Sequence, residues 1–339
     1  MIEIVGMDKA KELDDFIAKH PCGHFMQTSY WGKVKTEWEW IGILSKDANG
    51  KIKGVMGLLY RPLSIGISGL LYAPRGPVVD RDDTETFEEL VQAAKDLGKK
   101  RGAYTFRMDP EIPEDDKEYY DHCKSLGFQI DQASDYSLFQ PRLVYQLDLK
   151  GKTPETLLAS YHRSTRYNVN LAVRRGVTVR RGTVDEMPTF CALMEETAAK
   201  NEFSPRSKAY FELLMKGMGD YARLYFASLN GKLVAGSIVV FYGNKANLMY
   251  SCSTPDSFKD RPNELLQWTM QSDMIELGCE LYDFRGVEGY PEEDNPKIGL
   301  HKYKQGYDSK FVAFVGQVDY VIRPMVAKLY KFLTGIKKK

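Results

Sequence analysis

A cluster of arginines between residues 156 and 184 is the most distinctive chemical feature of the sequence. These 29 residues hold no Asp or Glu but six arginines, at positions Arg163, Arg166, Arg174, Arg175, Arg180 and Arg181. The whole chain of 339 residues carries 47 Lys and Arg against 46 Asp and Glu, a net charge of +1. Contact with phosphate groups must therefore come from a local cluster such as this one. A solvated helix face whose acidic partners lie elsewhere is the competing interpretation.

The sequence does not indicate disulfide or zinc-binding cysteines, nor a nucleophile motif. Five cysteines lie far apart and never form a C-x-x-C pair, so neither a disulfide framework nor a zinc knuckle is expected. The short Cys/His spacing Cys22-Gly23-His24 is a weak candidate for metal binding or catalysis. The sequence has no G-x-S-x-G nucleophile elbow. We expect no resident metal and no cofactor.

The elements that must position the functional side chains occur twice along the chain. Asn49-Gly50 and Asn230-Gly231 each separate two apolar runs, a pattern that predicts a β-hairpin closed by an Asn-Gly turn. Four landmarks repeat in the same order at offsets of 178 to 181 residues, namely Phe25/Phe203, Asn49/Asn230, Tyr72/Tyr250 and Phe106/Phe284. Helical patterns at 84–101 and 263–277 follow at equivalent places. We infer a tandem duplication of a mixed unit of strands and helices.

Turn residues at 150–152 mark the expected boundary between the halves. A helix is expected to start directly after them, because Thr153 suits the N-cap and Pro154 the first position of a helix. We expect domains at 1–147 and 148–317. A helix over 154–174 would bury one apolar face and present Arg163, Arg166 and Arg174 on another. A terminal amphipathic helix over 318–339 is expected to pack back on the first domain.

The sequence also bears on localisation. Acidic residues stand where a signal peptide needs cations, and the longest uncharged apolar stretch, 62–74, is shorter than the roughly 20 residues of a transmembrane helix. We expect a cytoplasmic protein that is soluble or peripheral to the membrane.

Several segments together resemble the Fem aminoacyltransferases. They are 25–31 (FMQTSYW), 72–77 (YAPRGP), 107–110 (RMDP), 203–211, 282–286 (YDFRG) and 299–307 (GLHKYKQGY). The resemblance spans almost the whole chain and implies an α/β (α+β) fold of two tandem acetyltransferase-like (GNAT) domains, in agreement with the duplication. No sustained heptad pattern matches the coiled-coil arm of the FemA and FemB branch, so the armless FemX-like branch is favoured.

The activity that this resemblance implies is transfer of an amino acid from aminoacyl-tRNA to the stem peptide of a peptidoglycan precursor, which builds the interpeptide bridge. The acceptor would be UDP-MurNAc-pentapeptide or a lipid-linked precursor, and the enzyme a monomer. An aminoacyl ester is already activated, so proximity and charge stabilisation suffice without a covalent intermediate.

Two residues are the catalytic candidates that the resemblance implies. Lys304 lies in the 299–307 segment and would offset the developing oxyanion or a tRNA phosphate; the alternative is one more lysine on a basic loop. Asp109 stands where the family places an acid near the acceptor amine, which it would deprotonate or orient. An Asp before a Pro is also a common turn residue, so a structural role stays open.

Substrate contacts are implied in the same way. For the diphosphate of the precursor, the resemblance points to two cations and two hydroxyl groups, Lys35, Arg206, Tyr210 and Tyr250, with Trp38 and Tyr104 as weaker candidates for precursor contact. The alternatives are a solvated lysine, an arginine paired with Glu202, and core tyrosines. The tRNA would contact Arg163, Arg166, Arg174, Arg175 and Lys302.

The sequence leaves three further possibilities open. The terminal cations Lys328, Lys331 and Lys337 to Lys339 suit an anionic membrane surface, although a solubilising tail is the favoured account. A plain acyl-CoA N-acyltransferase is disfavoured, because 79–83 and 256–263 contain no glycine for a pyrophosphate loop. A non-catalytic RNA-binding module would use the basic helix alone.

Overall fold

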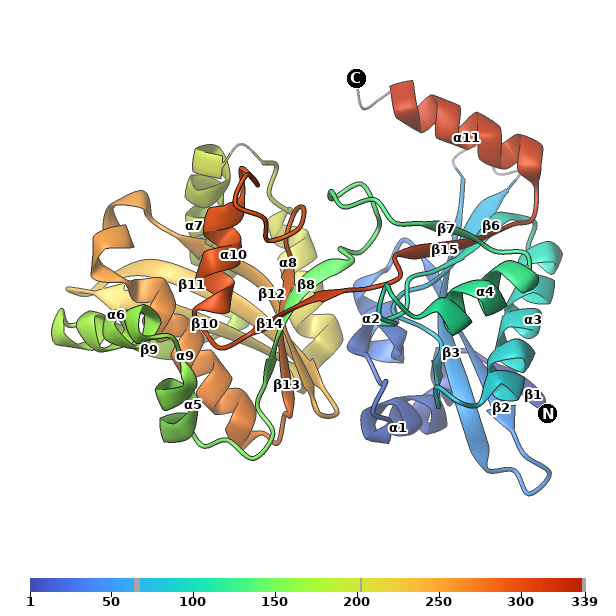
Figure 1. Cartoon of the computed structure of the whole chain (residues 1–339), viewed down its shortest axis with the longest axis horizontal. Coiled ribbons are helices and arrows are strands. Elements are labelled where there is room, and N and C mark those ends of the chain that lie inside the picture. The colour runs from blue at the N-terminus through green and yellow to red at the C-terminus, as the bar shows by residue number, and fades with distance from the viewer. Residues whose placement is uncertain (64–67, 202, 337–339) are drawn as a thin grey trace. The chain divides into compact units, whose positions relative to one another are not determined.

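The chain folds as two compact units. A computed structural model describes residues 1–63, 68–201 and 203–336 (Figure 1). Unit 1 comprises residues 1–142 together with the chain from 313 onward, and unit 2 comprises residues 143–312. Among the described residues, no helix combines the length and the apolar character that crossing a bilayer requires.

The sheet of unit 1 has the strand order β1 (Ile2–Val5), β2 (Glu39–Lys46), β3 (Ile52–Pro62), β4 (Gly69–Ala73), β6 (Ala103–Met108), β15 (Gln317–Val321) and β7 (Gln129–Asp131), with β5 (Val78–Val79) beside β3. Neighbours are antiparallel except for the parallel pair β4 and β6. The helices are α1 (Lys11–Lys19), α2 (Ser29–Val34), α3 (Thr84–Lys100), α4 (Lys117–Ser125) and α11 (Pro324–Ile336).

Alternation along β2 divides the core of unit 1 between the two faces of its sheet. Ile41 and Ile43 belong to the cluster that α3 covers with Leu90 and other apolar residues. Gly42 faces the other way, where a Cβ atom would lie 2.8 Å from Leu13 of α1. Helix α3 connects the parallel strands β4 and β6 and begins where the carboxylate of Asp83 accepts a hydrogen bond from a backbone N–H.

The sheet of unit 2 has the order β14 (Lys310–Ala313), β8 (Leu143–Asp148), β13 (Leu281–Gly286), β12 (Lys245–Ser253), β11 (Lys232–Tyr242), β10 (Ala222–Leu229) and β9 (Thr178–Gly182). Strands β12 and β13 are parallel and are connected by α9 (Pro262–Glu276). The other helices are α5 (Pro154–Ser160), α6 (Arg163–Arg174), α7 (Met187–Asn201), α8 (Lys208–Met218) and α10 (Ile298–Gln305).

Both faces of the unit 2 sheet carry helices. The hydroxyl of Tyr225 in β10 donates to Asp273 of α9 at 2.9 Å. On the opposite face, Phe190 of α7 and Phe211 of α8 stack edge to face, 5.2 Å between ring centroids. The parallel pair, its connecting helix and the hairpin before it therefore recur in both units, in the order that the duplication predicts.

The hairpins differ in their turns. In unit 2, Asn230 (φ 51°) and Gly231 (φ 76°) form the two-residue turn that the Asn-Gly signal predicts. In unit 1 the loop runs from 47 to 51, and the carboxylate of Asp47 accepts hydrogen bonds from the N–H groups of Asn49 and Lys51. An acidic side chain thus closes the longer loop.

The pairing of two strands, β8 and β15, sets the limits of the units. The strand beside β6 is β15, from near the end of the chain, and the strand beside β13 is β8, at the start of unit 2. The expected limits of 1–147 and 148–317 place most of β8 in the first domain, and the segment 318–339, which contains most of β15, is expected to pack back on that same domain as a helix. The pairing instead assigns β8 to unit 2, and within unit 1 it makes 317–321 a strand of the sheet and not part of a helix.

Two expected helices also differ. The helix expected over 154–174 is broken into α5 and α6, because Tyr161 and His162 are extended. The hydroxyl of Tyr161 donates to Gln271 at 2.5 Å, and the N–H of His162 donates to the carbonyl oxygen of Gly306. The expected terminal helix begins only at Pro324, because 317–321 form β15.

Candidate functional site

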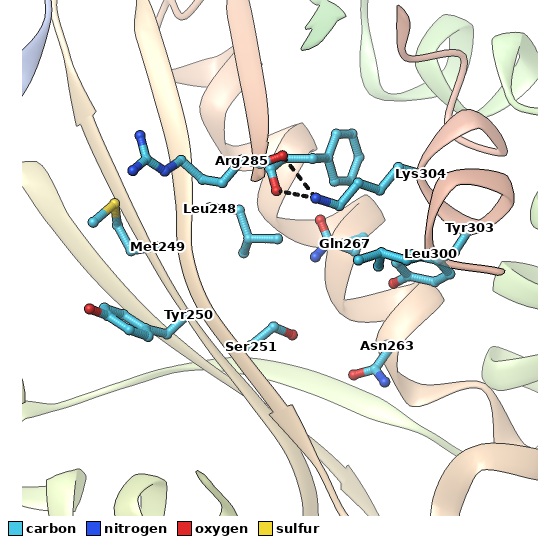
Figure 2. A pocket seen from close by; sticks show the side chains of 11 residues that line it. Leu248, Met249, Tyr250, Ser251, Asn263, Gln267, Arg285, Leu300, Tyr303 and Lys304 are labelled. Carbon is cyan, nitrogen blue, oxygen red and sulfur yellow. Dashed lines mark hydrogen bonds between the residues drawn. The ribbon is translucent and has the colours of Figure 1, made fainter. Parts of the chain in front are cut away.

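Lys304 occupies a buried cradle of backbone carbonyl groups in unit 2 (Figure 2). Its Nζ atom donates to the carbonyl oxygens of Phe284 at 2.9 Å, Arg285 at 2.9 Å and Gly286 at 2.7 Å. Arg285 has a left-handed backbone (φ 63°), and the pairing of β13 with β8 shifts register between Asp283 and Gly286. This bulge directs three successive carbonyl groups to one side chain.

The protonation of Lys304 is set by its burial. Only 6% of the residue is exposed, and burial lowers the pKa of its amine to about 7. The carboxylate of Asp283 opposes this effect, and the guanidinium of Arg285 adds to it. The three acceptors match the three N–H groups of an ammonium. Because its pKa is about 7, the amine of Lys304 passes from the charged to the neutral form near neutral pH.

A cavity of about 320 Å³ opens beside Lys304. Its walls come from β12, α9, β13 and α10, and Figure 2 shows Tyr250, Gln267 and Lys304 around it. Leu248 and Met249 contribute apolar surface. A partly apolar cavity with a few polar groups and a buried cation suits a small ligand part that carries or develops negative charge.

Three other predicted residues lie on the same unit as this cavity and contact one another. The hydroxyl of Tyr250, which lines the cavity, donates to that of Tyr210 at 3.3 Å. The guanidinium carbon of Arg206 lies 5.4 Å from the centre of the Tyr210 ring. Ser207 caps α8 and so fixes the position of Tyr210, whose pKa is raised by burial. Unit 2 thus brings together a cation, two phenols and the Lys304 cavity.

Lys35 and Trp38 lie at the end of α2 in unit 1. The Nζ atom of Lys35 is 4.7 Å from the centre of the Trp31 ring, and the N–H of Trp38 donates to the carbonyl oxygen of Lys35 at 2.8 Å. The ring of Trp38 is tilted against that of Tyr72, 6.3 Å between centroids. Both side chains are half-buried, and part of each faces solvent.

Asp109 is a buried carboxylate in unit 1, with 3% of the residue exposed. Its Oδ2 atom accepts from the hydroxyl of Tyr72 at 2.5 Å and its Oδ1 atom from the N–H of Arg75 at 2.7 Å. Burial raises the pKa of Asp109, and the nearby Arg75 opposes the rise. Both carboxylate oxygens are therefore occupied within unit 1.

Tyr104 packs against α11. Its ring lies 5.1 Å from that of Tyr330, and burial raises the pKa of its phenol. Tyr104 is thus placed as a packing aromatic between β6 and α11. Lys302 is exposed on α10. Glu202, the neighbour considered for Arg206, lies outside the described residues.

Helix α6 carries half of the arginine cluster on its solvent side. Arg163 and Arg174 are exposed, and Arg166 donates to the carbonyl oxygen of Ala159 at 2.8 Å. The guanidinium of Arg174 lies 5.5 Å from the centre of the exposed Tyr167 ring. The opposite side of α6 is buried and contacts α9.

The remaining arginines of the cluster have acidic partners, as the competing interpretation requires. Their partners are Asp260 for Arg175 at 3.2 Å, Glu186 for Arg180 at 2.6 Å and Asp273 for Arg181 at 3.0 Å. The side of α6 that carries Arg163, Arg166 and Arg174 is the part of the cluster best placed for a phosphate backbone. We call these three residues the α6 arginines.

Two important residues had no role in the sequence-based prediction. Arg285 shapes the carbonyl cradle through its left-handed backbone, for which the sequence offers no signal because this conformation favours Gly or Asn. Gln27 is fully buried, and its side chain bonds to Gly57 and to the carbonyl oxygen of Pro74. Thr28 and Ser29 beside it are also polar, so the sequence offers no signal that singles out Gln27.

No resident metal site emerges in the described part of the chain. There, no three His, Cys, Asp or Glu side chains gather in an arrangement that could hold a metal ion. His24 of the Cys22-Gly23-His24 segment is buried, and its Nδ1 atom accepts from the N–H of Met26. It acts there as a local cap.

Comparison with known proteins agrees with this fold. The FemAB family matches residues 9–233 and 230–335. The lipid II:glycine glycyltransferase of Staphylococcus aureus (strain bovine RF122 / ET3-1) is 25% identical over 402 residues, covering 96% of this chain and 94% of that protein.

Solved structures show the same architecture. The crystal structure of FemX has a TM-score of 0.88 at 24% identity, over 96% of this chain and 99% of that one. A tandem GNAT protein from the clavulanic acid pathway has a TM-score of 0.53 at 13% identity, over 95% and 98%. The expected α+β fold of two tandem GNAT-like units is confirmed. Because the family match spans most of its length, the chain belongs to the FemAB family.

Proposed function

We propose that this chain transfers an aminoacyl group from aminoacyl-tRNA to a stem-peptide amine of a peptidoglycan precursor. The observation that carries the proposal is the buried cation Lys304 at the wall of a cavity, in the same unit as the α6 arginines. The relationship to a lipid II:glycine glycyltransferase supports the acceptor class.

The reaction needs little covalent chemistry from the protein. The amine nitrogen attacks the ester carbonyl carbon, a C–N bond forms, and the C–O bond to the tRNA ribose breaks. The proton that the amine loses ends on the released ribose hydroxyl. Negative charge develops on the carbonyl oxygen in between, and a fixed positive charge in a water-poor cavity stabilises it.

Lys304 would supply that charge. All three of its N–H positions are directed at backbone carbonyls, so a substrate oxygen or phosphate bonds to Nζ directly only by displacing one of them. Without displacement, the charge acts through space across the cavity. A pKa of about 7 keeps about half of the amine protonated at neutral pH.

Acceptor binding would use the remaining predicted residues. We assign Lys35 and Arg206 to the diphosphate as cations, and Tyr210 with Tyr250 as hydroxyl donors. Trp38 and Tyr104 stay weaker candidates for precursor contact, Tyr104 the weaker because its ring packs on α11. The α6 arginines, with Arg175 and Lys302, would contact tRNA phosphates.

Asp109 would be a positioning residue. Its two oxygens hold Tyr72 and the backbone of Arg75, so the carboxylate fixes the 72–77 segment next to the Trp38 ring. Proton transfer from the acceptor amine would require one of these hydrogen bonds to open.

The helix starts favour a tRNA ester over acyl-CoA as donor. In GNAT-type folds a pyrophosphate would sit at the N-terminus of the helix that follows the central strands. In unit 2 that helix, α9, begins with Pro262, which has no N–H, and carries the buried Glu264 in its first turn. In unit 1, α3 begins with the capping carboxylate of Asp83. Carboxylates at both starts repel a pyrophosphate.

The test is a transfer assay with mass-spectrometric detection. The chain is incubated with a charged tRNA pool and either UDP-MurNAc-pentapeptide or lipid II, and the product should gain the mass of one amino acid. Acetyl-CoA in place of charged tRNA should give no product. Lys304→Ala should lose transfer while retaining tRNA binding, whereas the exposed Lys310→Ala should behave as wild type. Absence of product with every charged tRNA, or an acyl product from acetyl-CoA, would refute the proposal.

A further inference from the structure

Helix α11 presents a row of large apolar side chains to solvent. Met325 is 86% exposed, Leu329 53% and Phe332 66%. Their spacing of four and three residues puts them on one face of the helix. A different face packs on unit 1, where the Tyr330 ring contacts Tyr104. Unit 1 therefore satisfies one side of α11 and leaves an apolar row uncovered.

The charge around this row has one sign. From residue 322 to the end, the sequence contains six Lys and Arg and no Asp or Glu. Lys328 is exposed and lies between Met325 and Leu329 in the sequence of the helix. The guanidinium group of Arg323, just before α11, lies beside Gly102. Lys337 to Lys339 lie outside the described residues.

We propose that this face of α11, defined by Met325, Lys328, Leu329 and Phe332, docks on an anionic lipid bilayer. Helices with one apolar face and flanking cations lie in the membrane plane with the apolar side chains among the acyl chains. The lysines and arginines are attracted by anionic headgroups. A solubilising tail accounts for the cations but not for three large apolar side chains in a row.

Charge also argues against a second copy of the chain as the occupant. Two α11 helices packed face to face would bring two sets of cations together with no acid from either segment. An anionic surface instead attracts every one of these cations. If the proposed function holds, docking would present unit 1 at the surface where a lipid-linked acceptor resides; that step rests on the proposed function, whereas docking itself does not.

The test is co-sedimentation of the full chain with phosphatidylcholine vesicles, with and without phosphatidylglycerol. Binding should be at least about tenfold stronger with phosphatidylglycerol and should fall as salt is added. The triple change Met325→Ser, Leu329→Ser and Phe332→Ser should reduce binding by at least about tenfold. Lys328→Glu should weaken binding only to the anionic vesicles. Phe258→Ser, at a 63% exposed aromatic of unit 2, is the matched control and should bind as wild type.

Several results would overturn docking. In the first, a triple variant with an unchanged melting temperature binds vesicles as tightly as the wild type. In the second, the wild type shows no preference for anionic vesicles. In the third, the wild type is a dimer that the triple change converts to a monomer. Transfer to soluble UDP-MurNAc-pentapeptide separates this proposal from the proposed function, because the triple variant should keep it. Vesicle binding by a chain that transfers nothing would refute the function and support docking.

Discussion

The burial of Lys304 makes the stability of unit 2 depend on pH, and the change Lys304→Met should remove that dependence. The amine has an ordinary pKa of 10.5, which we take for the unfolded chain, and burial lowers its pKa in the fold to about 7. Between these values the unfolded chain binds the proton and the folded chain does not, so stability rises with pH. Below about pH 7 both states are protonated, and the penalty for burying the charge is constant.

The size of the effect follows from the two pKa values. The slope approaches about 1.4 kcal/mol per pH unit inside the window, which gives about 2 kcal/mol between pH 7 and pH 9. Methionine fills a similar volume without a proton, so its unfolding free energy lacks this contribution. It also leaves three carbonyl acceptors without a donor, at about 1 to 3 kcal/mol each if none finds water. The variant should therefore fall further below wild type as pH rises.

Urea unfolding followed by circular dichroism at pH 7, 8 and 9 measures this difference. The gap between wild type and Lys304→Met should widen by about 2 kcal/mol over this range. Lys310→Met, at an exposed position, is the control and should keep a constant gap from wild type. Parallel pH profiles for wild type and Lys304→Met would refute the reasoning, because they would mean that the carbonyl cradle keeps the amine protonated throughout.

The other predictions concern binding and the buried acid. Changing Arg163, Arg166 and Arg174 together to Gln should lower tRNA affinity and reduce the slope of log affinity against log salt by about 2 to 3, measured by filter binding; an unchanged slope would exclude these phosphate contacts. Arg206→Ala should raise KM for the nucleotide precursor by about tenfold or more with a smaller effect on kcat, and an unchanged KM would remove Arg206 from the acceptor site. Asp109→Asn should destabilise unit 1 by about 1 to 3 kcal/mol in urea unfolding and leave kcat of the folded enzyme nearly unchanged. A large loss of kcat at full stability would instead favour proton transfer by Asp109.

Local sequence signals were sufficient to predict the helices and hairpins that occur in both units. The helical patterns at 84–101 and 263–277 correspond to α3 (84–100) and α9 (262–276), and both Asn-Gly sites lie in hairpin loops. Each of these signals is read from residues adjacent in sequence, such as a turn dipeptide or a helical apolar period. The partner of a strand is not encoded in this way. The pairing of β8 with β13 and of β15 with β6 is therefore absent from the sequence-based prediction.

Long-range hydrogen bonds explain the broken helix. Residues 154–174 have a continuous helical pattern, yet Tyr161 and His162 are extended because Gln271 and Gly306 offer them better partners. The segment 318–321 is similar, since a short apolar run fits a strand as well as a helix. In both places tertiary contacts decided between local alternatives of comparable free energy.

Comparison of the two units locates the chemistry more sharply than either unit alone. Arg107 occupies the place of Arg285 in the duplication, but it pairs through two hydrogen bonds with Asp319 on β15, and the pairing of β6 with β15 has no register shift. Leu126 stands at the position that the offset of 178 residues assigns to Lys304. The bulge in β13 and the lysine that it holds therefore occur together in unit 2 and are both missing from the equivalent described places in unit 1. A bulge that turns three carbonyls inward is favourable only when a cation meets them, because unpaired buried carbonyls are costly. The segments 282–286 and 299–307 thus form one device, and substitutions in either should act through the charge of Lys304.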